Sequence, residues 1–189
     1  IHTRLLDDVR GQEKMPGMIR TSQNWIGGAN LNSAVFVPPH QLELGELLSD
    51  LEKFWHNEEW KVPSLIKIAI SHYQFETIHP FLDGNGRTGR LLITLQLLHY
   101  KLLDTPTLYL SAFFEQHRGE YVDALLRTSI SHDIDHWIRF FLTGIIESAI
   151  HSKTTFIAID LLIKDYNTRI QNLGRRKKLA FELLNIYCK

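Results

Sequence analysis

The 189-residue sequence contains one cysteine, Cys188, so it lacks the paired thiols that a disulfide framework needs. It also lacks long apolar runs: Thr94 and Gln96 interrupt even the stretch 91–98, far short of the ~18 residues of a membrane-spanning helix. Charge of neither sign is in excess, because 21 basic residues balance 21 acidic ones. This balance excludes bulk attraction to nucleic acid or to an anionic membrane. We therefore expect a cytoplasmic protein, with no membrane partner, that recognises other molecules through local sites.

The apolar residues make up 44% of the sequence, enough for a sizeable core, and most recur at helical spacing. The spacing predicts helices over about 44–55, 65–78, 120–128, 135–150 and 155–173. Six of the eight residues over 91–98 are apolar and leave almost no polar face, which is typical of a helix buried on all sides. Turn formers and β-formers between Gly11 and Pro39 predict a loop that carries a short hairpin. We therefore expect a mostly α fold, a helical bundle around a buried central helix with a small β-hairpin.

The composition divides the chain into three parts. Residues 1–150 are expected to form one domain, and residues 151–174 a C-terminal helix or linker that Gly174 ends. The basic run Arg175–Lys178 opens a third part, residues 175–189, whose apolar pattern resembles the first helix of an appended module. Because the sequence starts at Ile1 with neither methionine nor a leader pattern, we expect it to be a fragment of a longer protein.

Residues 79–90 read His-Pro-Phe-Leu-Asp-Gly-Asn-Gly-Arg-Thr-Gly-Arg and concentrate the groups that handle phosphate. A histidine such as His79 can accept a proton, and a carboxylate such as Asp83 can hold Mg²⁺ together with phosphate oxygens. Glycines expose backbone N–H groups to an anion, and Arg87 and Arg90, three residues apart, can bind one polyphosphate from the same side.

Two nucleotide-binding motifs compete for the same residues. Gly84–Gly89 matches G-x-G-x-x-G, with Asp104 twenty residues beyond its start, but no strand leads into Gly84 and no βαβ units follow. A P-loop would need G-x-x-x-x-G-K, which is absent from the sequence. The remaining interpretation is a loop between two helices, with its glycines at the N-terminus of the second, where unpaired N–H groups attract phosphate.

For several other residues a purely structural interpretation competes with a functional one. His132 and His136 have the spacing of a metal-ligand pair, but without a third ligand they are better explained as the solvated start of a helix capped by Asp133. The run Arg175–Lys178 is better explained as a solvated linker than as a nucleic-acid arm. Trp25 either contacts a ligand or packs in the core.

The motif resembles the signature of the Fic family, H-P-F-x-[D/E]-G-N-G-R-x-x-R, without a departure. The resemblance continues through 16–20, 23–28, 37–39, 72–78, 108–111 and 137–142, and covers about residues 1–150, with the flap at about 24–39 and the active-site loop at 79–90. It implies an all-α fold with a β-hairpin flap. It also implies transfer of AMP from ATP to a Ser, Thr or Tyr hydroxyl of a target protein.

The resemblance assigns roles to individual residues. His79 would be the catalytic base, Asp83 the Mg²⁺ ligand, and Phe81 a buried anchor of the loop. Phosphate or nucleotide binding would come from Gly84, Asn85, Gly86, Arg87, Thr88 and Arg90, with Tyr121 and Ser129 near the adenine, where relatives often carry two tyrosines and an asparagine. The flap residues Ile26, Gly27, Gly28 and Ala29 would dock the target as an added strand.

Several alternatives stay open at the level of sequence. The family resemblance also leaves open removal of AMP and transfer of UMP or phosphate. A function of another class stays open as well, that of a DNA-binding regulator with a winged-helix module starting near residue 175. We expect a bacterial type whose inhibitory helix lies upstream of Ile1, since Ser111–Gln116 and Thr143–Ser148 match that helix's pattern only in part. Self-AMPylation and a homodimer are also left open.

Overall fold

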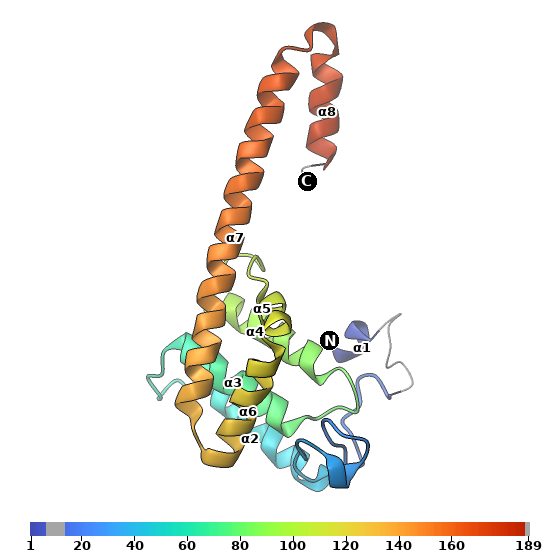
Figure 1. Cartoon of the computed structure of the whole chain (residues 1–189), viewed down its shortest axis with the longest axis vertical. Helices are drawn as coiled ribbons and strands as arrows, with labels where there is room; N and C mark the ends of the chain where they lie inside the picture. The colour runs from blue at the N-terminus through green and yellow to red at the C-terminus, as the bar shows by residue number, and fades with distance from the viewer. Residues whose placement is uncertain (7–13, 188–189) are drawn as a thin grey trace. The chain divides into compact units, whose positions relative to one another are not determined.

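The computed structural model describes residues 1–6 and 14–187. Cys188 and the first residues of the loop expected from Gly11 lie outside this range. Eight α-helices and three short 3-10 helices are formed within it (Figure 1). They are α1 (His2–Leu5), η1 (Leu31–Ser33), η2 (Gln41–Glu43), α2 (Leu44–His56), α3 (Ser64–Ile78), α4 (Asn85–His99), α5 (Leu110–Gln116), α6 (Arg118–Ser131), α7 (Ile134–Gln171), η3 (Gly174–Arg176) and α8 (Lys177–Tyr187). The mostly α fold is confirmed.

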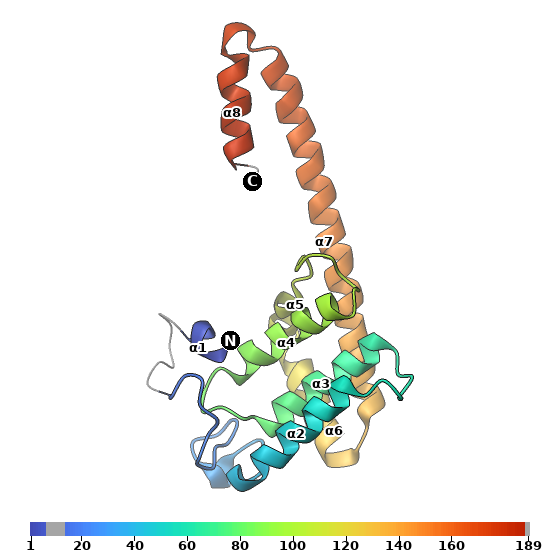
Figure 2. The same cartoon turned by 180° about the vertical axis from the view of Figure 1, so that it is seen from behind.

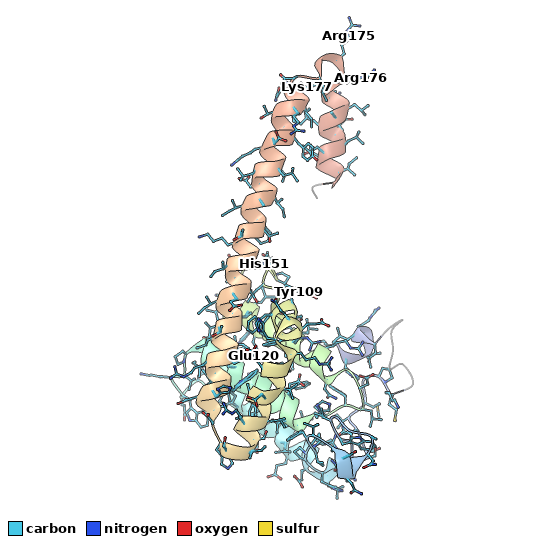
Figure 3. The ribbon with its side chains drawn as sticks, in the orientation of Figure 1. Tyr109, Glu120, His151, Arg175, Arg176 and Lys177 are labelled. Carbon is cyan, nitrogen blue, oxygen red and sulfur yellow. The ribbon has the colours of Figure 1, made fainter. Side chains whose placement is uncertain are left out.

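The chain divides into two compact units, residues 1–146 and 147–189. The first unit contains α1 to α6 and the start of α7. In the second unit, α8 runs back antiparallel to the last part of α7 (Figure 2). Arg175, Arg176 and Lys177 lie around the turn that joins these two helices (Figure 3). The boundaries at 150 and 174, and the winged-helix module, stay predictions.

The helices expected over 44–55, 65–78 and 120–128 correspond to α2, α3 and α6, but the two expected over 135–150 and 155–173 are one helix, α7. The polar residues from His151 to Thr154 interrupt the apolar pattern, yet none is a proline or glycine that would end a helix. The start of α7 is capped as predicted, since Asp133 Oδ1 accepts a hydrogen bond from His136 N at 3.2 Å. The short helix α5 was not predicted.

The most deeply buried helix is α3, and the prediction that the 91–98 segment is buried on all sides is wrong. Leu95 of α4 is exposed, whereas α3 buries a run of polar and apolar side chains between Lys67 and Ile78. Helix α3 contacts α2 and α4. Trp137 at the start of α7 is fully buried, and its Nε1 donates to Ala69 O of α3 at 2.8 Å. Polar residues on α3 therefore lie at the centre of the first unit, next to the loop that follows it.

The expected hairpin at 24–39 contains one bridged pair, Ile26 and Phe36, among the described residues. Ile26 N donates to Phe36 O at 2.9 Å and Phe36 N donates to Ile26 O at 3.1 Å. Between them, Asn30 caps η1 by accepting from Asn32 N and Ser33 N. Trp25 is 42% exposed, so its interpretation as a core residue is wrong.

Helices α3 and α4 approach each other closely at Gly89. A Cβ added at this position would collide with Glu76 Oε1 and would lie 3.2 Å from both His72 Cε1 and Phe75 Cδ1. We expect Gly89→Ala to lower the free energy of unfolding by about 1–3 kcal/mol, because the buried neighbours have little room to move. Urea denaturation measures this change.

Gly45 on α2 is the matched control, since a Cβ there would meet nothing within 4 Å. We expect Gly45→Ala to leave the stability unchanged or to raise it by up to about 1 kcal/mol, because alanine loses less entropy in a helix than glycine. Equal effects of the two substitutions would contradict the close approach at Gly89.

Candidate active site

His79 ends helix α3 in a left-handed backbone conformation, with φ 49° and ψ 59°. A residue other than glycine occupies this region only when the surroundings hold it there. Pro80 follows and stops the helix, and Arg20 Nε donates to His79 O at 3.0 Å. The turn directs the chain from α3 into the glycine loop with the His79 side chain at the junction.

Arg20 fastens three segments of backbone around His79. Its buried guanidinium donates to His79 O, to Pro39 O at 2.5 Å, to Ser22 O at 3.2 Å and to Ile78 O at 3.4 Å. The base of the hairpin and the end of α3 are thereby fixed to each other. The planar fork of donors makes arginine suited to several carbonyls at once.

The hydrogen bond of the His79 ring defines its free nitrogen. Nδ1 lies 3.2 Å from Glu76 O, and because a carbonyl can only accept, Nδ1 carries the hydrogen. Burial, with a contribution from the Arg20 charge, lowers the pKa of His79 to about 4, although the Glu76 carbonyl and Asp83 oppose this shift. At neutral pH the imidazole is therefore uncharged, and its Nε2 has a lone pair able to accept a proton.

Gly84 is the N-cap of α4 and has φ 81°, a conformation that glycine adopts without strain. The first intrahelical bond runs from Thr88 N to Gly84 O at 3.0 Å, so the N–H groups of Asn85 and Gly86 lie outside the helical ladder. The Asn85 side chain is buried and staples the loop: Oδ1 accepts from Phe81 N at 2.9 Å and Nδ2 donates to Phe81 O at 2.8 Å. Asn85 can therefore bind an anion through its backbone N–H group but not through its side-chain amide.

Thr88 does not fit the phosphate-binding role predicted for it. Its side chain is buried, and both its N–H and its hydroxyl donate to Gly84 O, at 3.0 and 2.9 Å. Both donors of this residue are used to start α4. We therefore remove Thr88 from the candidate phosphate ligands.

The N-terminal helix α1 contacts the loop through His2. His2 Nε2 donates to Asp83 O at 2.8 Å, while Nδ1 accepts from Gly17 N at 2.8 Å. The ring also stacks on Phe81, with 3.8 Å between ring centroids and 9° between planes. Phe81 is only partly buried, so its anchoring of the loop depends on this stack.

Asp83 and Arg87 lie on the side of the loop that faces α1. Arg87 Nη1 donates to Leu5 O at 3.1 Å, and Arg87 Nη2 lies 3.8 Å from Asp83 Oδ1. Asp83 Oδ1 also accepts from Gly84 N at 2.6 Å, and its side chain is 35% exposed. The carboxylate is thus oriented by two neighbours and still open to solvent.

The donor set around Asp83 fits a cation whose remaining ligands come from elsewhere. No group of three or more His, Cys, Asp or Glu side chains that could hold a metal occurs in residues 1–6 and 14–187. Mg²⁺ commonly binds through one carboxylate, water and substrate phosphates, so a single exposed carboxylate beside an anion hole is sufficient. His132 and His136 are not part of any such group among these residues.

A cavity of about 220 Å³ opens beside His79, between the hairpin, the end of α3, the start of α4 and α6. Most of its lining is apolar. The lining consists of Ile26, Val35, Phe36, Glu76, Thr77, His79, Gly86, Tyr121, Val122, Leu125, Leu126 and Ser129. An apolar cavity with a few convergent polar groups and a histidine with a perturbed pKa is the usual form of a ligand site.

A second, more polar cavity of about 340 Å³ shares Tyr121 and Val122 with the first. Arg90 lines it, with Glu115 of α5 and Arg118 of α6. Because Tyr121 and Val122 line both cavities, the two cavities are neighbours.

The structure brings together His79, Gly86, Tyr121, Ser129 and Ile26 around one cavity, with Arg90 in the next. Gly27, Gly28 and Ala29 do not line either cavity. The hydroxyls of Tyr121 and Ser129 already have partners, His72 Nε2 at 2.9 Å and Tyr73 Oη at 3.0 Å. These two residues can therefore contact a ligand mainly through van der Waals packing and not through new hydrogen bonds.

The lining residues Val35, Phe36, Val122, Leu125 and Leu126 were not predicted. Leu125 lies one turn of helix before Ser129, so the 3.6-residue period of α6 could have suggested it. Arg20 and Glu76 lie in the segments 16–20 and 72–78 that resemble the Fic family, but no role was predicted for either residue.

Comparison with known proteins places the chain in a family. The model of the Fic/DOC family matches residues 1–97. The chain belongs to the Fic/DOC family. Its Fic motif is the loop at 79–90, and the structure places that loop at the N-terminus of α4.

Curated Fic proteins resemble this chain over most of its length. "Protein adenylyltransferase Fic" of Aedes aegypti is 33% identical over 141 residues, 74% of this chain and 25% of that protein. "Protein adenylyltransferase fic-1" of Caenorhabditis elegans is 35% identical over 100 residues, 52% of this chain and 18% of that protein. The chain thus spans about a quarter or less of the length of these relatives.

Solved Fic structures have the same fold. A Fic family protein from Desulfovibrio desulfuricans G20 superimposes with a TM-score of 0.66 at 28% identity, over 77% of this chain and 43% of that one. Fic-1 of C. elegans gives 0.57 at 24% identity, over 85% and 42%. Because similar Fic proteins occur in insects, a nematode and a bacterium, the bacterial type stays a prediction. No helix within residues 1–6 and 14–187 is long and apolar enough to cross a membrane.

The contacts of His2 predict a measurable role in holding the Fic loop. In His2→Phe the ring can still stack on Phe81, but Gly17 N and Asp83 O lose their partner. We expect a loss of about 1–3 kcal/mol in the free energy of unfolding, because two hydrogen bonds that each contribute about 0.5–1.5 kcal/mol are lost. We also expect several-fold weaker nucleotide binding, since Asp83 and Arg87 depend on the same segment.

Urea denaturation and a nucleotide titration measure these two effects. His151→Phe is the control, because His151 is exposed on α7 in the second unit (Figure 3). A His2→Phe protein that matched this control in both measurements would show that α1 does not support the loop.

Proposed function

We propose that this chain is the catalytic domain of a protein adenylyltransferase, which transfers AMP from ATP to a hydroxyl group of a target protein. One observation carries the proposal: the uncharged His79, with Nε2 unprotonated, lines an apolar cavity at the point where the N-terminus of α4 presents its N–H groups. The names of the curated relatives support the same reaction class.

The two adjoining cavities suggest how ATP binds. The adenine and ribose would occupy the apolar cavity, between Ile26 of the flap and Leu125 and Ser129 of α6. The α-phosphate would lie beside His79 and the N–H groups of Asn85 and Gly86, and the outer phosphates would extend toward Arg90. Gly84 shapes this N-terminus, and Arg87 could turn from Leu5 O to a phosphate.

The reaction would be an in-line displacement. The target hydroxyl oxygen forms a bond to the α-phosphorus as the bond from that phosphorus to the bridging oxygen breaks, and pyrophosphate leaves with the bonding electrons. His79 Nε2 takes the hydroxyl proton, giving an imidazolium that later releases it to solvent. The product is a phosphodiester between the target side chain and AMP.

Asp83 would hold Mg²⁺ when the nucleotide is bound. A divalent cation neutralises developing charge on the phosphates and helps to orient them. Asp83 is prepared for this by Gly84 N and Arg87, which fix one carboxylate oxygen and leave the side chain accessible.

The flap would dock the target as an extended strand, because the bridge at Ile26 and Phe36 borders the cavity. Main-chain pairing positions a hydroxyl over the α-phosphate with little dependence on the target's side chains. Gly27 and Gly28, both with φ 70°, keep the tip of the flap compact.

The group that is transferred identifies the reaction. Incubation of the chain with a lysate and Mg²⁺, with ATP or UTP in separate samples, followed by mass spectrometry of the modified proteins, distinguishes AMP, UMP and phosphate. We expect the mass of AMP on a Ser, Thr or Tyr, on a target or on the chain itself, only in the ATP sample. A UMP or phosphate adduct alone would contradict the proposal.

A further inference from the structure

Glu76 lies on the last turn of α3, one turn before His79, and lines the same cavity. The residue is 8% exposed. Oε1 has no hydrogen-bond partner in the described part of the chain. A carboxyl group buried in this way, at the edge of a ligand cavity, needs a partner that the protein itself does not supply.

The charged and titratable groups around Glu76 come from three helices. A Cβ added at Gly86 would lie 3.1 Å from Arg90 Nη1 and 4.0 Å from Glu76 Oε1, so the guanidinium and the carboxyl both lie beside the start of α4. His72 of α3 and Tyr121 of α6 bond to each other. No ion pair of Glu76 occurs among the residues that the structure describes.

Glu76 is the one member of this group whose charge changes near neutral pH. Burial raises the pKa of Glu76 to about 7, although the Arg90 charge opposes this. Burial lowers the pKa of His72 to about 3 and that of His79 to about 4, and raises the pKa of Tyr121 well above 10. Between pH 6 and 8 the other three groups are therefore uncharged while Glu76 titrates.

A polyphosphate beside Gly86 would lie close to this carboxyl. Two like charges in a water-poor site repel each other strongly, whereas a protonated carboxyl donates a hydrogen bond to a phosphate oxygen. A bound polyphosphate therefore favours the neutral form of Glu76.

We propose that Glu76 recognises the nucleotide as a neutral carboxylic acid, donating its O–H to a phosphate oxygen beside Gly86, so that nucleotide binding takes up one proton. The inference rests on the proposed binding of ATP. The proton comes from solvent and adds to the carboxylate, and no covalent bond of the nucleotide changes.

The pH dependence of nucleotide affinity tests this inference. The probe is an ATP analogue with a methylene group between the α- and β-phosphates, titrated with Mg²⁺ at pH 6 and pH 8 by calorimetry. The proteins are the wild type, Glu76→Gln and the control Glu120→Gln, whose exposed side chain lies on α6 (Figure 3). Glutamine at position 76 keeps an N–H donor and cannot ionise.

We expect the wild-type affinity to fall from pH 6 to pH 8 by about tenfold more than the Glu76→Gln affinity, since one linked proton lost over one pH unit above the pKa changes binding tenfold. Glu120→Gln is expected to follow the wild type. Binding at pH 8 in two buffers of different ionisation enthalpy should show uptake of about one proton by the wild type and none by Glu76→Gln.

Identical pH profiles for the wild type and Glu76→Gln would overturn the inference while leaving ATP binding intact. Loss of binding by a folded Glu76→Gln at both pH values would also overturn it, because the carboxylate itself would then be required. Absence of binding by all three proteins would overturn the proposed nucleotide site together with the inference, and so separates the two failures.

Discussion

Replacing His79 by alanine is expected to reduce adenylyl transfer by about 10²–10⁴-fold, the usual contribution of a positioned general base. The residue lines the cavity with Nε2 unprotonated and its other nitrogen bonded to Glu76 O. Initial rates of AMP incorporation, at saturating ATP, measure the loss. Affinity for the nucleotide should change little, because the base acts on the target hydroxyl.

A second variant distinguishes loss of the base from a change in folding. His79 has a left-handed backbone, which asparagine tolerates better than alanine, so His79→Asn should preserve the loop while removing the base. His151→Ala, at an exposed position of α7, is the control and should retain full activity. Transfer by His79→Asn within a few-fold of the wild type would show that His79 is not the base.

Replacing Arg20 by alanine is expected to give the largest loss of stability, roughly 3 kcal/mol or more in the free energy of unfolding. Arg20 is 2% exposed, and its guanidinium donates to four carbonyls, among them His79 O and Pro39 O. Removal would leave these acceptors, most of them partly buried, without their donor. Because the base of the flap and the end of α3 share this residue, activity should fall even where the protein remains folded.

The matched control is Arg169→Ala on α7, whose pair with Asp165 at 2.8 Å is solvent-exposed. Exposed ion pairs contribute about 0–1 kcal/mol, so this variant should unfold near the wild-type denaturant concentration. If chemical denaturation gave the same small change for Arg20→Ala, Arg20 would not fasten the site.

The sequence predicted those features that depend on local pattern. Turn residues and an apolar period identified α2, α3 and α6, and the order of residues from Gly84 to Arg87 predicted a loop that opens a helix. The sequence could not show which helix is the most deeply buried. Leucines over 91–98 suggested the most buried helix, but α3, with His72 and Glu76, lies deeper because it is covered by α2 and α4.

Residues of the candidate site that escaped prediction are those whose role depends on distant segments. His2 meets Asp83, and Arg20 meets His79, only after the chain has folded back over many residues. Thr88 fails for the opposite reason, since it belongs to the motif but its donors are consumed within one turn of α4. A motif therefore names the chemistry, while tertiary contacts decide which of its side chains remain available.

The most direct test of the account uses ATP labelled in two positions. Wild-type and His79→Asn proteins are incubated with Mg²⁺, a lysate and either α-³²P-ATP or γ-³²P-ATP, and the protein-bound label is counted. We expect the wild type to incorporate the α label above the level of the lysate alone and to release the γ label as pyrophosphate, while His79→Asn adds neither label to that level. Incorporation of the γ label above the level of the lysate alone, or equal α labelling by both proteins, would contradict the proposed transfer of AMP.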